Sequence, residues 1–295
     1  MRVMAFSDIH SVFDTWDAVY THMMRQQPDA YWCVGDIVGR GYEPIMVAQS
    51  LKSLYMRQDA THRKAWVIGN HDHNVVYEQT IQIGDTILPS ARMNPTDVAL
   101  DADNRLSMQA GERADLLTWL GGLPVYGQDI IPKILEGVHV VHGRFTIDGA
   151  GIINEEDCIW EYCKTDDDVR AQIDHLHRYN HQLPRVVING HTHYPMIALY
   201  DATTGKITRV KEEELSHTHT FDLTANKTLV INTGSVSFPK EIHPKHAIYA
   251  MLNFGANYCV EAQIYQICLP KDGLNIPQGY NARFAHELRG LGVCD

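Results

Sequence analysis

The sequence predicts an α/β protein with two sheets, and three observations lead to that expectation. In the first 70 residues, short apolar runs alternate with segments of helical periodicity, which is typical of parallel strands joined by crossover helices. After residue 195 the helical periodicity ends, and short strand-like segments between turn residues predict mostly antiparallel pairing. No repeat or linker-like stretch divides the chain, so we expect residues 1–295 to form a single domain.

The N-terminal elements follow from their apolar spacing. Strands are predicted at residues 2–7, 30–35 and 64–68, each a short run of mainly apolar residues. The first helix has one apolar face, formed by Trp16, Val19, Tyr20, Met23 and Met24. The second is expected to open at Pro44, because the proline ring suits the first helical position.

Between residue 73 and about residue 136 the periodicity loosens, and we expect a helical cap or insertion over one rim of the sheet. One helix stands out in this segment, at residues 112–120. Beyond it, a helix is expected to begin at the acidic triplet 166–168, since the helix dipole favours negative charge there. The other predicted elements are strands at residues 138–142, 185–189, 196–200, 206–210, 217–223, 228–232, 247–253 and 260–267.

Composition narrows the class of protein. The chain is 44% hydrophobic and 21% charged, as in ordinary globular proteins. Its formal net charge of −11 argues against stable nucleic-acid binding, which requires a basic surface, and against binding to a membrane surface. No apolar stretch approaches the ~20 residues of a membrane-spanning helix. The six cysteines form no C-x-x-C pair, so we expect reduced thiols in a cytoplasmic protein.

Side chains with metal-binding chemistry follow five of the predicted strands. Ligands collect at the carboxyl ends of the strands in a parallel α/β sheet, so these side chains are expected to converge. One such motif alone would be a weak signal, but five in succession are not plausibly chance. In chain order they are Asp8 and His10, Asp36, Asn70 and His71, His142, and His191 and His193.

Three other histidines serve as contrasts. The segment His217-Thr218-His219 repeats the H-T-H pattern, but it lacks a preceding apolar strand and glycine, so we do not expect it to bind metal. His139 lies three residues before His142 on the same predicted strand and therefore points to the opposite face. We interpret it as a packed or surface histidine.

The donor types indicate the kind of metal. Aspartate, asparagine and histidine supply oxygen and nitrogen donors without thiolate, which suits Mn, Fe, Zn, Ni or Co rather than a cysteine-rich structural zinc site. Seven such side chains are enough for two metal ions if one carboxylate bridges them. Two metal ions would outweigh the charge of two aspartates and a bridging hydroxide, so the site would suit a phosphate ester in spite of the acidic chain.

The motifs D-I-H, G-D-I-V-G-R-G, G-N-H-D, H-G and G-H-T-H, between residues 8 and 193, resemble those of the calcineurin-like metallophosphoesterase superfamily. The later N-T-G-S-V at residues 232–236, with Pro239-Lys240 after it, is similar to a loop of the bacterial phosphodiesterase-like branch. The resemblance implies a four-layer α/β/β/α sandwich and two divalent or trivalent transition metal ions.

The resemblance also implies roles for individual residues. The first metal would be held by Asp8, His10, Asp36 and His193, and the second by Asp36, Asn70, His142 and His191. A metal-bridging hydroxide would attack phosphorus. His71 would protonate the leaving oxygen or grip the phosphate, and Arg40 would bind phosphate oxygens, although a rim ion pair is an equal alternative for Arg40.

Several positions depart from the family pattern. Protein phosphatases of the superfamily carry an aspartate where this chain has Gly39, and that aspartate orients the catalytic histidine. Asp72 is a candidate substitute. Ser11 and Thr233 replace a glycine and a proline, and both are expected to be tolerated in their loops.

These features favour a phosphoesterase that hydrolyses a phosphodiester or a small organic phosphate. The alternatives are a dinucleoside polyphosphate hydrolase, a Ser/Thr protein phosphatase, which Gly39 disfavours, and a non-enzymatic interaction scaffold on the same fold. A scaffold has no need of all seven donors, which this chain retains. The expected partner is a phosphorylated small molecule or nucleotide.

Overall fold

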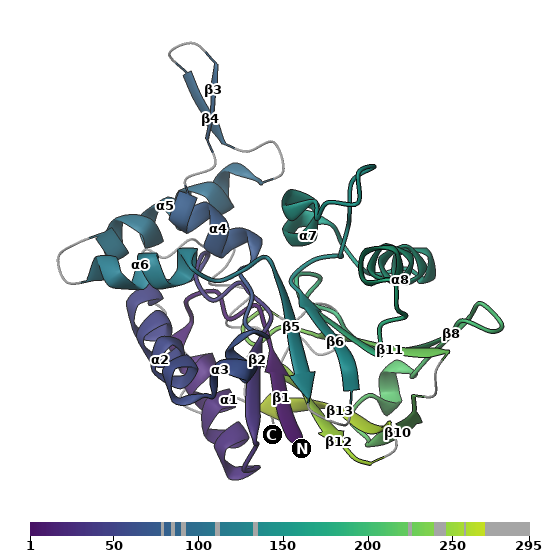
Figure 1. The fold of residues 1–295 in the computed structure, drawn as a ribbon. Coiled ribbons are helices and arrows are strands. Elements are labelled where there is room, and N and C mark those ends of the chain that lie inside the picture. Colours follow the sequence, from purple (N-terminus) through teal and green to yellow (C-terminus); the bar gives the residue numbers. More distant parts are fainter. Residues whose placement is uncertain are drawn as a thin grey trace.

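Two large sheets form the centre of the molecule (Figure 1). The computed structural model describes residues 1–77, 80–83, 86–89, 93–109, 113–131, 135–223, 226–238, 246–256 and 258–268. The first sheet has the strand order β10-β13-β12-β1-β2, and the second has the order β5-β6-β7-β11-β8-β9. A separate hairpin of β3 and β4 projects at the top of Figure 1.

The described strands and helices have the following bounds. The strands are β1 (Arg2–Phe6), β2 (Ala30–Cys33), β3 (Thr80–Ile83), β4 (Thr86–Pro89), β5 (Tyr126–Ile131), β6 (Leu135–Val141), β7 (Val186–Asn189), β8 (Pro195–Asp201), β9 (Lys206–Arg209), β10 (His219–Asp222), β11 (Lys227–Thr233), β12 (His246–Phe254) and β13 (Cys259–Cys268). The helices are α1 (Phe13–Arg25), α2 (Pro44–Arg57), α3 (Ala60–Arg63), α4 (Asn70–Tyr77), α5 (Pro95–Gln109), α6 (Ala114–Gly121), α7 (Glu155–Trp160) and α8 (Asp166–Asn180), with a 3₁₀ turn at Glu212–Glu214.

The alternation of side chains along β1 shows how the layers are built. Met4 and Phe6 point to the outer face of the first sheet, where Phe6 packs on Trp16 of α1 with ring centroids 4.9 Å apart. Val3 and Ala5 point to the inner face and join a core between the two sheets. Helices α1 and α2 therefore cover the first sheet from outside (Figure 1).

The second sheet has the same alternation, with its helix on the other outer side of the sandwich. Val186 and Ile188 of β7 enter the core between the sheets, whereas Val187 faces outward. On that outer face α8 packs with Val169, Ile173 and Leu176, which are fully or almost fully buried. The observed order is helix, sheet, sheet, helix, so the predicted four-layer α/β/β/α sandwich is confirmed.

Most predicted strands and helices are present, with two corrections. The strand expected at residues 64–68 is reduced to an isolated parallel bridge between Val34 and Val67. Ile68 N–H instead donates to the Pro124 carbonyl, which diverts the chain from the sheet. In segment 73–136 the predicted helix appears as α6, but α5 and the hairpin β3–β4 were not anticipated, and β5 belongs to the second sheet.

The cysteines give a third correction. Cys33, Cys158, Cys163 and Cys259 are free thiols, as expected, but Cys268 is disulfide-bonded. Pairing of cysteines depends on tertiary proximity, which the spacing in this sequence does not reveal. None of the helices in the described parts of the chain has both the length and the apolar character needed to cross a bilayer. A cytoplasmic location stays a prediction.

The buried histidine of β6 leads to a test of stability. His139 is 3% exposed and lies against the Tyr126 hydroxyl, 2.5 Å from its Nδ1. Burial lowers the pKa of His139 from 6.5 to about 4. As the pH falls below 6.5, His139 therefore becomes protonated in the unfolded chain but stays neutral in the folded protein, and the unfolding free energy decreases.

We predict that His139→Gln removes this pH dependence. Between about pH 7 and about pH 5 the wild-type protein should lose about 2 kcal/mol more unfolding free energy than the variant. Urea unfolding at the two pH values measures the difference, and the exposed His177→Gln serves as the control. An equal loss in His139→Gln and wild type would contradict the assignment.

Candidate metal centre

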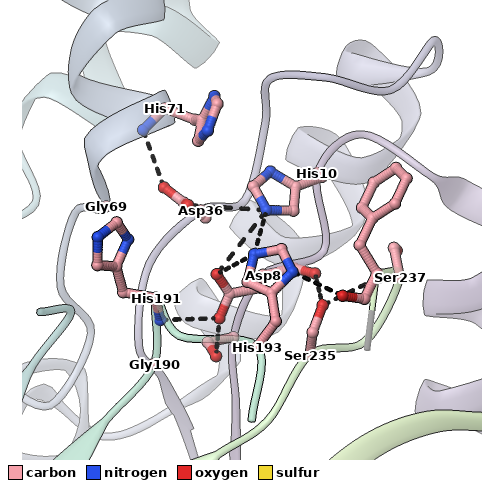
Figure 2. Close-up of polar contacts among 12 residues, drawn as sticks. Asp8, His10, Asp36, Gly69, His71, Gly190, His191, His193, Ser235 and Ser237 are labelled. Atoms are coloured by element: carbon pink, nitrogen blue, oxygen red, sulfur yellow. Dashed lines mark hydrogen bonds and ion pairs between the residues drawn. The ribbon is translucent and has the colours of Figure 1, made fainter. Parts of the chain in front are cut away.

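The seven predicted metal ligands meet in one buried cluster. Figure 2 shows Asp8, His10, Asp36, His191 and His193 of this cluster. Each lies at or just beyond the end of a strand, or at the first position of α4 in the case of Asn70. None of the seven side chains belongs to a residue more than 8% exposed. The carboxyl ends of β1, β2, β6 and β7 thus bring together residues that are up to 185 positions apart, because 193 − 8 = 185.

The first group of donors consists of Asp8, His10 and His193. His193 Nε2 lies 3.1 Å from Asp8 Oδ1 and 3.2 Å from His10 Nε2. Three donor atoms from β1 and β7 loops therefore point to a common centre, as Figure 2 shows.

The second group consists of Asp36, His142 and His191, with Asn70 beside them. His142 Nε2 lies 3.2 Å from Asp36 Oδ2 and 3.0 Å from Asn70 Oδ1. The same Asp36 Oδ2 is 3.7 Å from His10 Nε2 of the first group. Asp36 consequently lies between the two groups, and its donor atoms also lie close to those of His10 and His71, which form a third set within metal-binding reach. The division into two ligand sets stays a prediction.

The orientation of the donors fits a metal. Asp8 Oδ1 and Asp36 Oδ2 are buried but receive no hydrogen bond of good geometry from any described residue. Three of the four histidines direct their other nitrogen away from the centre: His193 Nδ1 donates to the Phe238 carbonyl, His142 Nδ1 to that of Val34, and His191 Nε2 to that of Trp160. Such outward hydrogen bonds are typical of metal-ligating histidines, because they fix the ring and its tautomer.

The electrostatics of the metal-free site show the same demand for positive charge. Burial alone would raise the pKa of Asp36, but His142 and His71 hold it well below its usual value. Burial opposes a charged His142, yet Asp36 outweighs it and raises the pKa of His142 to about 9. The proton on His142 then supplies a positive charge beside Asp36, a charge that a metal cation would also supply.

The backbone of these loops is unusual. Asp8, His10, Asp36, His191 and His193 have φ values of 56°, 51°, 52°, 63° and 61°, in the left-handed region that non-glycine residues seldom occupy. Such conformations persist only where the surrounding structure holds them, and they concentrate at functional sites.

A loop from the C-terminal half supplies part of that support. Ser235 Oγ donates to the Asp8 carbonyl at 3.0 Å, and Ser237 Oγ donates to the Ile9 carbonyl at 2.6 Å. Asn232 Nδ2 donates to the Gly190 carbonyl at 2.7 Å. The N-T-G-S-V segment therefore holds both the D-I-H and the G-H-T-H loops by hydrogen bonds to their backbone carbonyls. Figure 2 shows the contact of Ser235. Pro239 and Lys240, which follow it, lie outside the described residues.

His71 is oriented by a residue that the sequence did not single out. Its Nδ1 lies 2.9 Å and 3.1 Å from the two carboxylate oxygens of Asp101, which is fully buried on α5. Asn74 Nδ2 and the Arg40 backbone N–H also donate to Asp101. Burial alone would lower the pKa of His71, but Asp101 raises it above its ordinary value.

The glycine at position 39 leaves the space for this carboxylate. A Cβ on Gly39, whose φ is +90°, would lie 2.6 Å from Asp101 Oδ1 and 2.7 Å from His71 Cβ. The departure from the family pattern at Gly39 is therefore accompanied by an aspartate from another element. Asp72, the substitute expected from the sequence, instead accepts hydrogen bonds from the backbone N–H groups of Val38 and Gly69.

Two further polar residues of α5 reach the same loops. Asn104 accepts hydrogen bonds from Ser11 Oγ and from the Gly39 N–H. Asp97 pairs with Arg40, whose Nε lies 3.2 Å from Asp97 Oδ1. Positions 97, 101 and 104 share one helix face, and a polar face of this kind gives no apolar stripe. This is why the sequence did not reveal α5, although its spacing could have indicated a polar buried face.

The cluster opens into a cavity of about 570 Å³. Its lining includes four of the proposed ligands as well as His71 and Arg40. The described lining residues are Asp36, Arg40, Asn70, His71, Met93, Asn94, Asp97, Trp160, Glu161, Tyr162, His191 and His193. The volume lies in the range of ordinary small-molecule sites. The contrast histidines do not line this cavity. His139 packs on Tyr126, and His219, on β10, lies against the carbonyl of Glu214.

Comparison with known proteins agrees with this geometry. A model of the calcineurin-like phosphoesterase family matches residues 1–195. The chain belongs to this family. Membership supports hydrolysis of phosphoesters and the binding of divalent metals.

Individual relatives are distant. The uncharacterized protein MJ0912 of Methanocaldococcus jannaschii is 23% identical over 239 residues, which are 81% of this chain and 77% of that protein. The crystal structure of a metallophosphoesterase from Sphaerobacter thermophilus superposes with a TM-score of 0.61 at 21% identity and covers 97% of this chain and 100% of that chain. This likeness concerns the fold.

The geometry of the second group predicts the effect of removing the Asn70 amide. Asn70→Ala deletes an oxygen 3.0 Å from His142 Nε2, so the variant should hold one metal ion fewer than the wild type or bind it much more weakly. Elemental analysis after dialysis against Mn²⁺ measures the stoichiometry. The exposed Asn226→Ala, on a turn far along the chain, should match the wild type. Full metal content in Asn70→Ala would remove Asn70 from the ligand set.

Proposed function

We propose that this protein is a dinuclear metal-dependent phosphoesterase that hydrolyses a phosphodiester or a small organic phosphate. The observation that carries the proposal is the pair of buried donor groups joined by Asp36. Asp8, His10, Asp36 and His193 would hold one ion, and Asp36, Asn70, His142 and His191 the other. When bound, such ions lower the pKa of water, neutralise phosphoryl oxygens and align the reacting groups.

The protein's own side chains supply the remaining steps. Because His71 Nδ1 is held by Asp101, the proton available for exchange is on Nε2, at the cavity that His71 lines. Asp101 favours the charged form of His71, the form that a proton donor to the leaving-group oxygen requires. Arg40 lines the same cavity and supplies a fixed positive charge near the entering phosphate.

Asp101 is the positioning residue for His71 in this scheme. Its carboxylate has three partners, namely His71 and Asn74 of α4 and the Arg40 backbone N–H, so it cannot turn away without breaking several hydrogen bonds. An aspartate behind a catalytic histidine fixes the tautomer and stabilises the charged ring. The cap segment thus contributes directly to the proposed chemistry.

The donor groups and the cavity volume bear on the two remaining alternatives, an interaction scaffold and a dinucleoside polyphosphate hydrolase. An interaction scaffold needs no pair of converging donor groups, and this chain retains all of them. A cavity of about 570 Å³ accommodates a small phosphate ester or one end of a nucleotide. Dinucleoside polyphosphates therefore stay among the substrates to be tested, along with simple esters.

The proposed activity predicts metal-dependent turnover. Protein loaded with Mn²⁺ should hydrolyse at least one of three substrates: a phosphomonoester, a phosphodiester and a dinucleoside polyphosphate. Removal of the metals with a chelator should abolish the reaction, and Asp36→Asn should lose it even with added Mn²⁺, since Asp36 belongs to both donor groups. If the fully metal-loaded protein hydrolyses none of the three substrates, the proposed activity is refuted.

The geometry around His71 predicts a separate effect on rate. His71→Ala and Asp101→Asn should retain both metals but lose about 10- to 1000-fold in kcat, because proton donation to the leaving group is impaired. The loss should be larger for substrates with poor leaving groups and KM should change little. The exposed Asp103→Asn on the same helix is the matched control. Equal losses for good and poor leaving groups would show that neither residue acts in proton transfer.

A further inference from the structure

An ion pair lies in the lining of the cavity that the donor groups face. Arg40 and Asp97 both line the cavity, with Arg40 Nε 3.2 Å from Asp97 Oδ1 and Arg40 Nη2 3.4 Å from Asp97 Oδ2. The Asp97 side chain is 7% exposed and that of Arg40 is 18% exposed. Screening by water is weak at such exposures, so each charge is felt by a ligand in the cavity.

The position of Asp97 is fixed by its own helix. Asn94, just before α5, accepts hydrogen bonds from the backbone N–H groups of Thr96 and Asp97, each at 3.0 Å. The Asn94 side-chain amide also donates to the Asp97 carboxylate. Because these contacts hold the carboxylate in place, a ligand that approaches Arg40 also approaches Asp97.

The other described lining residues outside the donor groups add little net charge to that of the Arg40–Asp97 pair. Among the cavity-lining residues that the structure describes, Arg40 is the only lysine or arginine. The other carboxylate outside the donor groups is that of Glu161, whose Oε2 lies 3.3 Å from Arg144 Nη2. Apart from His71, the one cationic side chain of the described lining is therefore offset by one fixed anion.

We propose that Asp97 is a specificity-determining residue that makes the site favour monoanionic phosphodiesters over dianionic phosphomonoesters. The inference rests on the proposed phosphoesterase function and names its substrate class. A phosphomonoester carries close to two negative charges above its second pKa of about 6, whereas a diester carries one. Repulsion by Asp97 scales with that charge, so it penalises the monoester more.

A purely structural role for Asp97 predicts a different pattern. If Asp97 only anchored α5 or Arg40, its loss would disturb the site for both ester classes alike. The ratio of the two specificity constants therefore separates the roles, whereas activity on one substrate does not.

The experiment compares Asp97→Asn with the wild type on two esters that share a leaving group. The substrates are p-nitrophenyl phosphate and p-nitrophenyl phenyl phosphate, at about pH 8, above the second phosphate pKa of about 6. The monoester-to-diester ratio of kcat/KM should rise about three- to tenfold in Asp97→Asn, the size expected for one nearby unit charge. Arg40→Gln should move the ratio in the opposite direction, and the exposed Asp103→Asn on the same helix should leave it unchanged.

A binding measurement makes the result independent of turnover. Calorimetry on the metal-loaded proteins compares inorganic phosphate, a dianion at this pH, with diphenyl phosphate, a monoanion. Asp97→Asn should tighten the binding of inorganic phosphate relative to diphenyl phosphate by the same factor. Metal content and thermal unfolding confirm that the variants are folded, and Arg40→Gln tests the pair from its other side if Asp97→Asn does not fold.

The outcomes are distinguishable. A kinetic ratio and a binding preference that both stay within about twofold of the wild type in Asp97→Asn would overturn the inference, as would a proportional loss for both ester classes. If the metal-loaded wild type hydrolyses neither of these esters nor a dinucleoside polyphosphate, the proposed function fails, but the binding comparison still decides whether Asp97 discriminates between the two charge states.

Discussion

Two buried carboxylates impose the main constraint on this structure. Asp8 and Asp36 are fully buried, and each has one oxygen anchored by a backbone N–H, that of His191 at 3.1 Å and that of His71 at 2.9 Å. Their other oxygens face the donor groups without a well-formed hydrogen bond. Ionised carboxylates in such surroundings cost several kcal/mol unless cations compensate them. The histidines, the tight loops and the supporting serines all follow from the need to hold these charges where metals can neutralise them.

Helix α5 shows how a family site is maintained when familiar residues change. Its polar face touches the loops at Ser11 and Gly39, two positions where the chain departs from the family pattern. A side chain at position 39 and a carboxylate at position 101 would occupy the same space. The two loci therefore form one steric unit although they are 62 positions apart in the chain, since 101 − 39 = 62. Substitution at either one must be judged together with the other.

The sequence predicted the central framework well because the signals there are local. Apolar runs marked β1, β2 and β7, and the donors that follow them lie where the sheet rule places them. The third strand was overestimated because apolar residues 65–68 are buried without forming a ladder, and only Val67 makes a bridge. Asp97, Asp101 and Asn104 escaped detection because a polar residue in a helix reads as exposed until its tertiary partners are known. Ring orientations and the outward hydrogen bonds to carbonyls are likewise properties of the packed structure.

The placement of β1 has a consequence for how the protein acquires its metal. This strand pairs with β2 on one side and with β12 on the other, whose partners for residues 2–5 are residues 250–253. All proposed ligands precede residue 194, yet Ser235 and Ser237 hold the loop that carries Asp8 and His10. A nascent chain that has emerged only to residue 195 would contain every donor without the elements that fix their positions. Tight metal uptake should therefore be a late event in biogenesis, after the last strands have closed over the first.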